Sequence, residues 1–533
     1  MSLLRSIFSF SSMTLVSRVL GLVRDVVLAR WFGATAATDA FFVAFKIPNF
    51  LRRLFAEGSF SLAFVPVLAE YRERGDRAAM KSLVDATAGS LLAVLLALTG
   101  LGMLATPWII RIFAPGFADD PAQQTLAAEM LRVTFPYLLF IALTALSGGI
   151  LNTLGRFALP ALTPALLNVS LITAAVVFSA RFAEPVKALA WGVLVAGVLQ
   201  LVIQLPALAR HGLLPRPRPG FRHPGVRRIM TLMIPTLFGS SVAQINLLFD
   251  VLIASLLVEA SISWLYYGDR LMEFPLGMFG VALSVVILPT LSSLHARADG
   301  AQFRNTMEWA VLLGLAIGLP AAIGLGVLAG PTATTLFHYG EFSARDVDMT
   351  ALALGAYCLG LPAFIGVKIL APAFFSRQDT RTPVRIAVVA LVVNMALNVL
   401  FVVAIAWRLT GEVFLDDPWT ALALQPGAHA GLALASGVAG WLNAGLLWKN
   451  LARQGLTPAF PWRDLGRIAM AGVTMAVVLL WLVPATVEWL DMRLTLRVVW
   501  LTAAVIAGAA VYALVLAAAG LRPGRLMRPH GPE

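Results

Sequence analysis

Residues 38–61 read TDAFFVAFKIPNFLRRLFAEGSFS, and this stretch places charged side chains inside an otherwise apolar run. Asp39, Lys46 and Arg53 are seven residues apart, so an α-helix places them on one face. A charge in the middle of a bilayer costs about 2.5–3.5 kcal/mol even on lenient insertion scales. We therefore expect a membrane helix whose polar face meets water or other polar helices instead of lipid.

The same pattern recurs on two other apolar segments. Residues 8–33 contain Arg18, Arg24 and Asp25, and residues 268–294 begin next to a cluster of acidic and basic side chains. Such a concentration of charge predicts a hydrated cavity through which a polar molecule moves. Apart from the candidate substrate-binding residues, the other candidate cavity residues are Asp25, Asp39, Lys46, Asn49, Arg53, Glu57, Asp269 and Glu273.

The composition identifies the class of protein. Of 533 residues, 59% are hydrophobic and only 13% are charged, whereas soluble proteins carry about 25% charged residues. The chain is therefore expected to be an integral membrane protein. Its formal charge of +12 is spread over short loops and the charged segments, which argues against a nucleic-acid partner. The lone Cys358 excludes an intramolecular disulfide, and the scattered histidines predict no metal site.

The expected fold is an all-α polytopic membrane protein with about fourteen transmembrane helices. The candidate spans are 8–33, 34–67, 83–110, 126–151, 158–180, 187–209, 227–258, 268–294, 306–330, 350–374, 383–408, 429–450, 464–486 and 496–520. The first two are the weakest, because charge dilutes their apolar character. Lys and Arg gather in one alternate set of connections and near both termini, which predicts that both termini are cytoplasmic.

An internal repeat suggests two lobes. Leu104-Ala105-x-Pro107 matches Leu328-Ala329-x-Pro331, and a Phe and a Gly follow each copy at the same spacing. The two copies are six helices apart, and this even number gives them the same orientation in the membrane, so the repeat is parallel. We expect two lobes of six helices each, with two further helices appended at the C-terminus. We expect an N-lobe at 1–220, a C-lobe core at 221–425, its last span at 426–455, and the final two spans with the tail at 456–533.

Arginine is the dominant cation of the charged segments. Its planar fork of donors suits phosphate or carboxylate, whereas a cavity for cations would favour carboxylates and aromatic rings. Internal ion pairing, for instance Arg24 with Asp39 or Arg270 with Glu273, is an alternative for any single residue. Asp250, Asn394 and Asn398 are a weaker candidate for an ion site.

Two stretches resemble a known family. SRVLGLVRD at residues 17–25 and the stretch at 38–61 are similar to the hallmark segments of the MviN/MurJ family of bacterial lipid II flippases, which belongs to the multidrug/oligosaccharidyl-lipid/polysaccharide exporter superfamily. The resemblance covers essentially the whole chain. It implies that lipid II, the undecaprenyl-pyrophosphate-linked peptidoglycan precursor, crosses from the cytoplasmic to the periplasmic leaflet of the inner membrane by alternating access. The implied substrate-binding residues are Arg18, Arg24, Arg52 and Arg270.

The resemblance also implies a transporter and not an enzyme, with the lipid tail passing between spans 1 and 8 and resting in a groove at spans 13–14. The sequence has no G-x-x-x-x-G-K-[ST] phosphate loop. We therefore expect no cofactor and a driving force from the membrane potential or an ion gradient. The expected partners are lipid II, membrane lipids and cell-wall synthesis proteins. A drug or organic-cation exporter, a membrane enzyme acting on lipid-linked sugars, and a scaffold are the alternatives.

Overall fold

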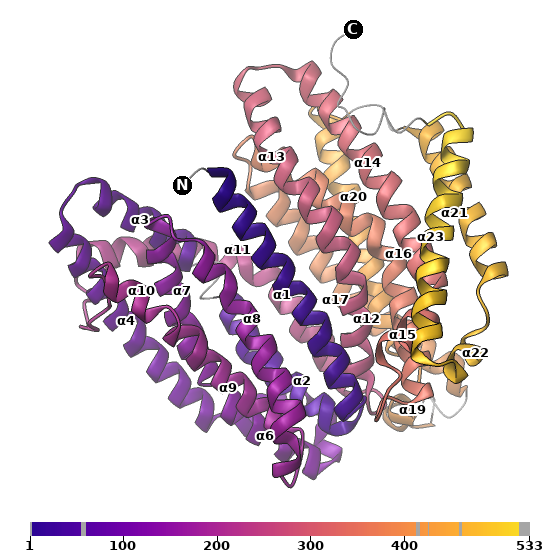
Figure 1. Ribbon diagram of the computed structural model, residues 1–533, viewed down its shortest axis with the longest axis horizontal. Helices are drawn as coiled ribbons and strands as arrows, with labels where there is room; N and C mark the ends of the chain where they lie inside the picture. Colours follow the sequence, from indigo (N-terminus) through magenta and orange to yellow (C-terminus); the bar gives the residue numbers. More distant parts are fainter. Residues whose placement is uncertain (1–2, 55–59, 412–415, 425, 458–460, 522–533) are drawn as a thin grey trace. The chain divides into compact units, whose positions relative to one another are not determined.

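The computed structural model describes residues 3–54, 60–411, 416–424, 426–457 and 461–521, with side chains of the first helix from Ser17 onward. Within these ranges all regular structure is helical, as Figure 1 shows and as the sequence predicts. The chain forms two compact units, Met1–Ala260 and Ser261–Glu533.

The first unit begins with two helices that carry most of the predicted site. Its elements are α1 (Leu3–Phe32), α2 (Ala36–Leu51), α3 (Ser61–Glu73), α4 (Arg77–Leu104), α5 (Thr106–Phe113), η2 (Pro115–Asp119), α6 (Pro121–Thr134), α7 (Tyr137–Thr153), α8 (Ala158–Thr173), η3 (Ala174–Phe178), η4 (Ser179–Arg181), α9 (Lys187–Val202), α10 (Leu205–Arg210) and α11 (Pro224–Ser255).

The second unit begins with the third charged helix and ends with the appended pair. Its elements are α12 (Ser261–Pro275), η5 (Leu276–Gly280), α13 (Val281–Ala296), α14 (Gly300–Val327), α15 (Ala329–Phe337), α16 (Ala344–Phe375), α17 (Arg381–Thr410), α19 (Pro418–Leu424), α20 (Ala430–Arg453), α21 (Trp462–Leu482), α22 (Thr486–Asp491) and α23 (Leu494–Ala518).

The sequence repeat has a structural counterpart in each unit. Helices α4 and α14 both contain 28 residues, and each begins with an aspartate cap: the carboxylate of Asp76 accepts from the amide of Ala79, and that of Asp299 from the amide of Gln302. Such caps satisfy amides that lack a partner within the helix. A short helix of 8 residues follows α4 and one of 9 residues follows α14. The matched sequence motifs therefore mark matched turns.

Eleven helices in the described ranges are long and apolar enough to cross a membrane. They correspond to all predicted spans except 8–33, 34–67 and 227–258. All three of these spans lie partly outside the residues whose side chains are described. The multi-pass helical fold is confirmed, and the count of fourteen remains a prediction.

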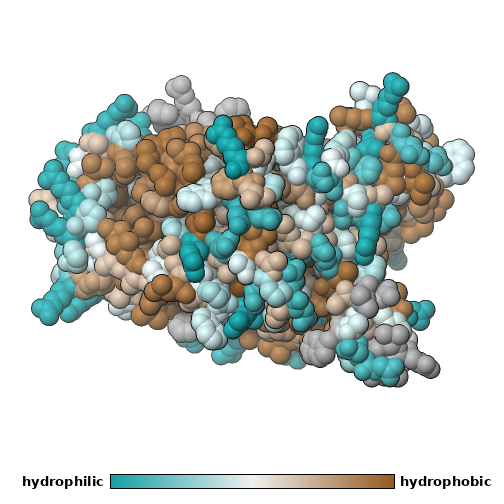
Figure 2. Space-filling model, turned by 90° about the horizontal axis from the view of Figure 1, so that it is seen from below, coloured by the Kyte–Doolittle hydropathy of each residue, from teal (hydrophilic) through white to brown (hydrophobic). Residues whose placement is uncertain are grey.

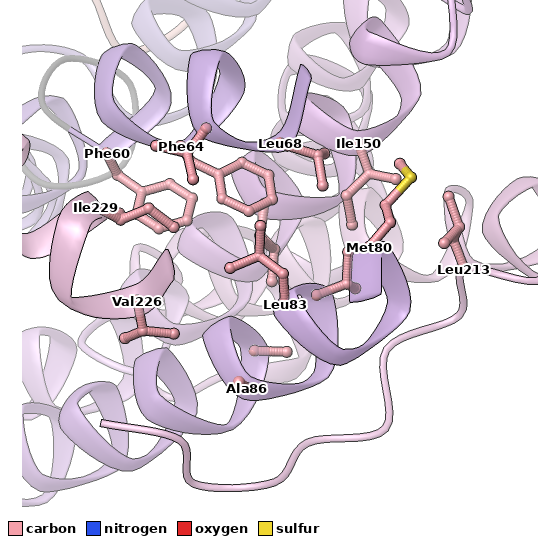
Figure 3. Close-up of a cluster of buried hydrophobic side chains, with 14 of the residues drawn as sticks. Phe60, Phe64, Leu68, Met80, Leu83, Ala86, Ile150, Leu213, Val226 and Ile229 are labelled. Carbon is pink, nitrogen blue, oxygen red and sulfur yellow. The ribbon is translucent and has the colours of Figure 1, made fainter. Parts of the chain in front are cut away.

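A buried apolar cluster fastens α11 within the first unit. Phe64 and Leu68 of α3, Leu83 of α4 and Ile150 of α7 meet Val226 of α11 in this cluster (Figure 3). The compact units consequently divide after Ala260, whereas the sequence analysis placed the boundary of the lobes at 220–221. The difference arises from α11. By its place in the repeat this helix is the equivalent of α1 and begins the second lobe, but it packs on α3 and α4 of the first unit.

The surface of the helices is largely apolar. Leu101, Leu104 and Leu514 are 65%, 79% and 70% exposed, and Figure 2 shows wide hydrophobic areas between hydrophilic groups. Exposed apolar area on this scale marks a surface made for lipid. In the second unit, α21 and α23 lie side by side and pack on α14 through Leu312, Ile468 and Leu516. This places the appended pair on the body of its unit.

Candidate functional site

Helix α1 holds two of the predicted arginines in different surroundings. Arg18 is exposed, whereas Arg24 is only 6% exposed and Asp25 only 2%. The Nε and Nη2 atoms of Arg24 both donate to Oδ1 of Asp25, at 2.9 and 2.7 Å. A buried guanidinium needs such a partner, because an uncompensated charge away from water is strongly destabilising.

A third residue completes this buried group. Asn168 on α8 accepts a hydrogen bond from Nη1 of Arg24 at 3.0 Å, and its Nδ2 donates to the carbonyl oxygen of Ser17 at 3.1 Å. Helices α1 and α8 pack along each other in the first unit. Nothing in the sequence around Asn168 reveals which helix its side chain meets.

Helix α2 contains the predicted polar stripe. Thr35 caps its N-terminus, with its hydroxyl accepting from the amide of Thr38 at 3.3 Å. Asp39 is buried in the first turn, where the partial positive charge of the helix N-terminus favours a carboxylate. Lys46 and Arg53 are half-buried. This fits the prediction that the charged face of the segment does not lie wholly in the apolar core.

The end of α2 is irregular at the predicted substrate arginine. Pro48 lies inside the helix, and residues 52–54 form a π-helical turn. Nε of Arg52 donates to Oδ1 of Asn49 at 2.8 Å, so these two candidate residues are brought together. Glu57 lies outside the described residues. A proline removes one backbone donor from a helix and thereby favours such a local change of winding.

Helix α12 has the same construction in the second unit. Pro275 ends it, and the π-helix η5 follows at Leu276–Gly280, the position that the repeat pairs with the turn after α2. Nη1 of Arg270 donates to Oε2 of Glu273 at 2.8 Å, and the guanidinium lies 5.1 Å from the ring centre of Tyr266. The proposed pairing of Arg270 with Glu273 is thus present. Asp269 beside them is half-buried.

The structure brings the candidates together in three local groups: Arg24 with Asp25, Arg52 with Asn49, and Arg270 with Glu273. Among the residues of the weaker candidate ion site, Nδ2 of Asn398 donates to Oδ1 of Asn394 at 3.0 Å, and both are buried. Helices α2 and α12 both contain a proline and are both followed by a π-helical turn, and turns of this kind are frequent at functional sites.

One buried arginine was not predicted. Arg497, in the first turn of α23, is 5% exposed and donates only to backbone oxygens and a histidine ring among its described hydrogen bonds. Its place at the edge of an apolar run does not distinguish it from an ordinary loop cation. Its position becomes apparent only when α15 and α22 meet α23.

The family model described as "Lipid II flippase MurJ" matches residues 28–500. The chain belongs to the MurJ family. The MurJ protein of Vibrio cholerae serotype O1, named as a probable lipid II flippase, is 45% identical over 98% of this chain and 97% of its own length. The lipid II flippase MurJ of Burkholderia cenocepacia is 41% identical over 92% of each chain.

Solved structures agree with this assignment. A lipid II flippase MurJ in an inward closed conformation superposes with a TM-score of 0.78 at 26% identity, covering 96% of this chain and 98% of that one. An inward-facing multidrug transporter of the MATE family superposes with a TM-score of 0.64 at 14% identity, covering 84% of this chain and 98% of the other. The second likeness concerns the fold alone.

Proposed function

We propose that this chain moves lipid II from the cytoplasmic to the periplasmic leaflet of the bacterial inner membrane. The observation that carries the proposal is membership of the MurJ family along nearly the whole chain. The function is that of a multi-pass transporter and not of an enzyme, so lipid II leaves the protein chemically unchanged. The helical architecture with its apolar surface is consistent with this role.

Arg18, Arg24, Arg52 and Arg270 are the proposed binding residues for the pyrophosphate. Guanidinium groups bind phosphate oxygens through paired donors and keep their charge in any protein environment. The exposed Arg18 is suited to meet a polar head group first. The other three already hold a side-chain oxygen, at Asp25, Asn49 and Glu273, and each exchanges that acceptor for a phosphate oxygen in our proposal.

The acidic and amide residues beside the arginines have a second role in this proposal. Asp25, Asn49 and Glu273 keep the guanidinium groups occupied while no substrate is bound, and Asp39, Lys46, Arg53, Glu57 and Asp269 keep the cavity hydrated. The conversion between loading and release is proposed to be alternating access through an arginine-containing cavity, with the π-helical turns after α2 and α12 as places where helices bend. The membrane potential or an ion gradient is the proposed driving force.

An exporter of drugs or organic cations is the alternative that shares the architecture. Buried carboxylates without competing cations would favour it. Here the buried Asp25 is bound to Arg24, and the exposed Glu273 is bound to Arg270. In both pairs an arginine already compensates the carboxylate, which argues against a cationic substrate. The charge distribution of the loops supports the proposal that both termini lie on the cytoplasmic side. Because lipid II is a peptidoglycan precursor, the proposal also includes contacts with cell-wall synthesis proteins.

The test is the accessibility of lipid II in each leaflet of cells that lack their own flippase and carry this chain. Wild type should restore periplasmic lipid II, and Arg18→Ala, Arg24→Ala, Arg52→Ala and Arg270→Ala should each abolish it at equal expression. Arg30→Ala is the matched control on α1, because Arg30 is exposed and lies against the ring of Trp31. If wild type restores nothing although it is inserted, or if all four variants work normally, the proposal is wrong.

A further inference from the structure

The contact between α1 and α8 contains a buried amide side chain, that of Asn168, where simple helix packing would use an apolar residue. Helix α8 is apolar apart from a few small polar residues, yet Asn168 is buried in its interior at 6% exposure. Asparagine is a poor helix former, and a buried amide is unfavourable unless both of its ends are hydrogen-bonded. Both ends of Asn168 are bonded, and both bonds go to α1.

The two bonds reach different points of α1. The donor of Asn168 meets the carbonyl oxygen of Ser17, and its acceptor meets the guanidinium of Arg24, about two helical turns further on. Side chains in a helix point toward its N-terminus, so Arg24 reaches back toward the level of Ser17. One amide thereby fixes both the backbone beside Arg18 and the charged end of Arg24.

The pairing of Arg24 with Asp25 gives this contact its importance. Neighbouring residues of a helix project in directions about 100° apart and do not face each other. The guanidinium therefore has to turn toward the carboxylate, with Nε and Nη2 on Asp25, and this leaves Nη1 on the opposite side of the fork. Asn168 occupies that side and holds the fork in one orientation.

We infer that Asn168 is a positioning residue, which sets the direction of the Arg24 guanidinium and the rotation of α1 at Arg18 for binding of a pyrophosphate. The inference rests on the proposed function, in which these arginines bind the head group. An amide suits the task because it offers a donor and an acceptor at once without a charge. A carboxylate in its place would neutralise Arg24 a second time, and an alkyl side chain would release it.

The first unit also offers a matched comparison, at the contact between α8 and α9. Gln200 of α9 is equally buried, and its Nε2 donates to the carbonyl oxygen of Thr163 on α8 at 2.8 Å. Among the described hydrogen bonds, this amide joins two helices through a backbone oxygen and bonds to no charged group. Gln200→Ala therefore removes a buried amide contact of α8 while leaving the surroundings of Arg24 in place.

The experiment measures the dissociation constant of lipid II with the purified full-length protein in nanodiscs. Asn168→Ala should raise it about tenfold, while Gln200→Ala should leave it within about twofold, with thermal unfolding recorded for both. In an Arg24→Gln background, Asn168→Ala should add no further loss, because a positioning residue acts only through the group it holds. Asn168→Asp, which keeps the shape, should also weaken binding by adding charge.

The outcomes separate the two claims. If Arg24→Gln weakens binding but Asn168→Ala or Asn168→Asp binds as wild type does, the positioning role is overturned and the proposed function stands. A loss from Asn168→Ala that adds in full to that of Arg24→Gln, or that Gln200→Ala reproduces, likewise identifies Asn168 as packing alone. If Arg24→Gln leaves the dissociation constant unchanged, the proposed anion site fails, and the positioning role fails with it.

Discussion

Two buried arginines, Arg24 in the first unit and Arg497 in the second, are equally shielded from water but compensated in different ways. Arg24 is 6% exposed and meets the side chains of Asp25 and Asn168. Arg497 is 5% exposed and donates to the carbonyl oxygens of four residues, and its guanidinium lies 5.6 Å from the ring centre of Tyr339. The carbonyls belong to Thr334, His338, Trp489 and Leu490.

The carbonyls around Arg497 come from the C-terminal ends of α15 and α22. Helix C-termini carry partial negative charge and unpaired carbonyls, so one cation satisfies both helix ends. The same cation stands in the first turn of its own helix, where the dipole is unfavourable, and it stays there because α15 and α22 compensate it.

The type of acceptor determines whether each guanidinium group is able to exchange its partner for a ligand. A guanidinium held by backbone carbonyls cannot leave them without unfolding two helix ends, so Arg497 fastens α23 to α15 and α22. A guanidinium held by side chains can exchange them for another oxygen ligand when rotamers change. Burial by itself therefore does not separate a structural arginine from a binding one, whereas the type of acceptor does.

The largest effect on stability is expected for Arg497→Leu. Removing this cation takes a donor from four carbonyl oxygens at once, and each buried polar group left without a partner costs about 1–3 kcal/mol. The free energy of unfolding, measured by titration with sodium dodecyl sulfate in mixed micelles, should fall by about 3 kcal/mol or more.

Arg493→Leu is the matched control, because Arg493 caps the same helix but is exposed. Its effect should stay within about 0.5 kcal/mol. Equal effects of the two substitutions would show that Arg497 does not fasten the appended helices.

A smaller loss is expected for Asp25→Asn. The amide keeps an acceptor near Arg24 but removes the compensating charge, and hydrogen bonds to charged groups contribute about 1.5–3 kcal/mol. Unfolding in the same assay should show a loss of about 2 kcal/mol. An unchanged protein would mean that other groups compensate Arg24, and the contrast with Arg497 would weaken.

A still smaller effect is expected for Glu273→Gln. The Arg270–Glu273 pair is 31% and 46% exposed at its two side chains, and exposed pairs contribute about 0–1 kcal/mol because water and salt screen them. Stability should change by less than about 0.5 kcal/mol, while transport of lipid II should respond if the pair takes part in binding. A stability loss as large as that of Asp25→Asn would place this pair with the structural contacts.

The smallest effect concerns pH at the outer end of the second unit. His338 follows α15, outside the candidate membrane helices, and burial together with the nearby Arg497 lowers its pKa below the ordinary 6.5. The folded protein thus binds fewer protons than the unfolded chain when the pH falls below about 6.5. The contribution of neutral His338 to the free energy of unfolding is therefore complete above about pH 6.5 and is lost as the pH falls below it. Thermal unfolding should shift downward between pH 7.5 and 5.5, and His338→Gln should reduce that shift; an equal shift in the variant would refute the assignment.

Local pattern alone selects much of the candidate site. Arg18, Arg24, Asp39 and Arg270 stand out because charge inside an apolar run is expensive, and this holds whatever the rest of the fold does. Pro48 and Pro275 are likewise recognisable in the sequence as helix breakers, and π-helical turns follow both helices. The division of the units after Ala260 was not predictable, because the apolar face of α11 fits either unit by sequence alone.

The sequence by itself determined that the chain is a helical membrane protein with charged, broken helices and an internal repeat, because hydropathy, charge and turn residues act within a single segment. Only the tertiary structure decided that Asn168 holds Arg24 and that Arg497 joins α15, α22 and α23. Partners so far apart in sequence meet through helix packing, and the free energy of a buried polar group depends on the partner it meets.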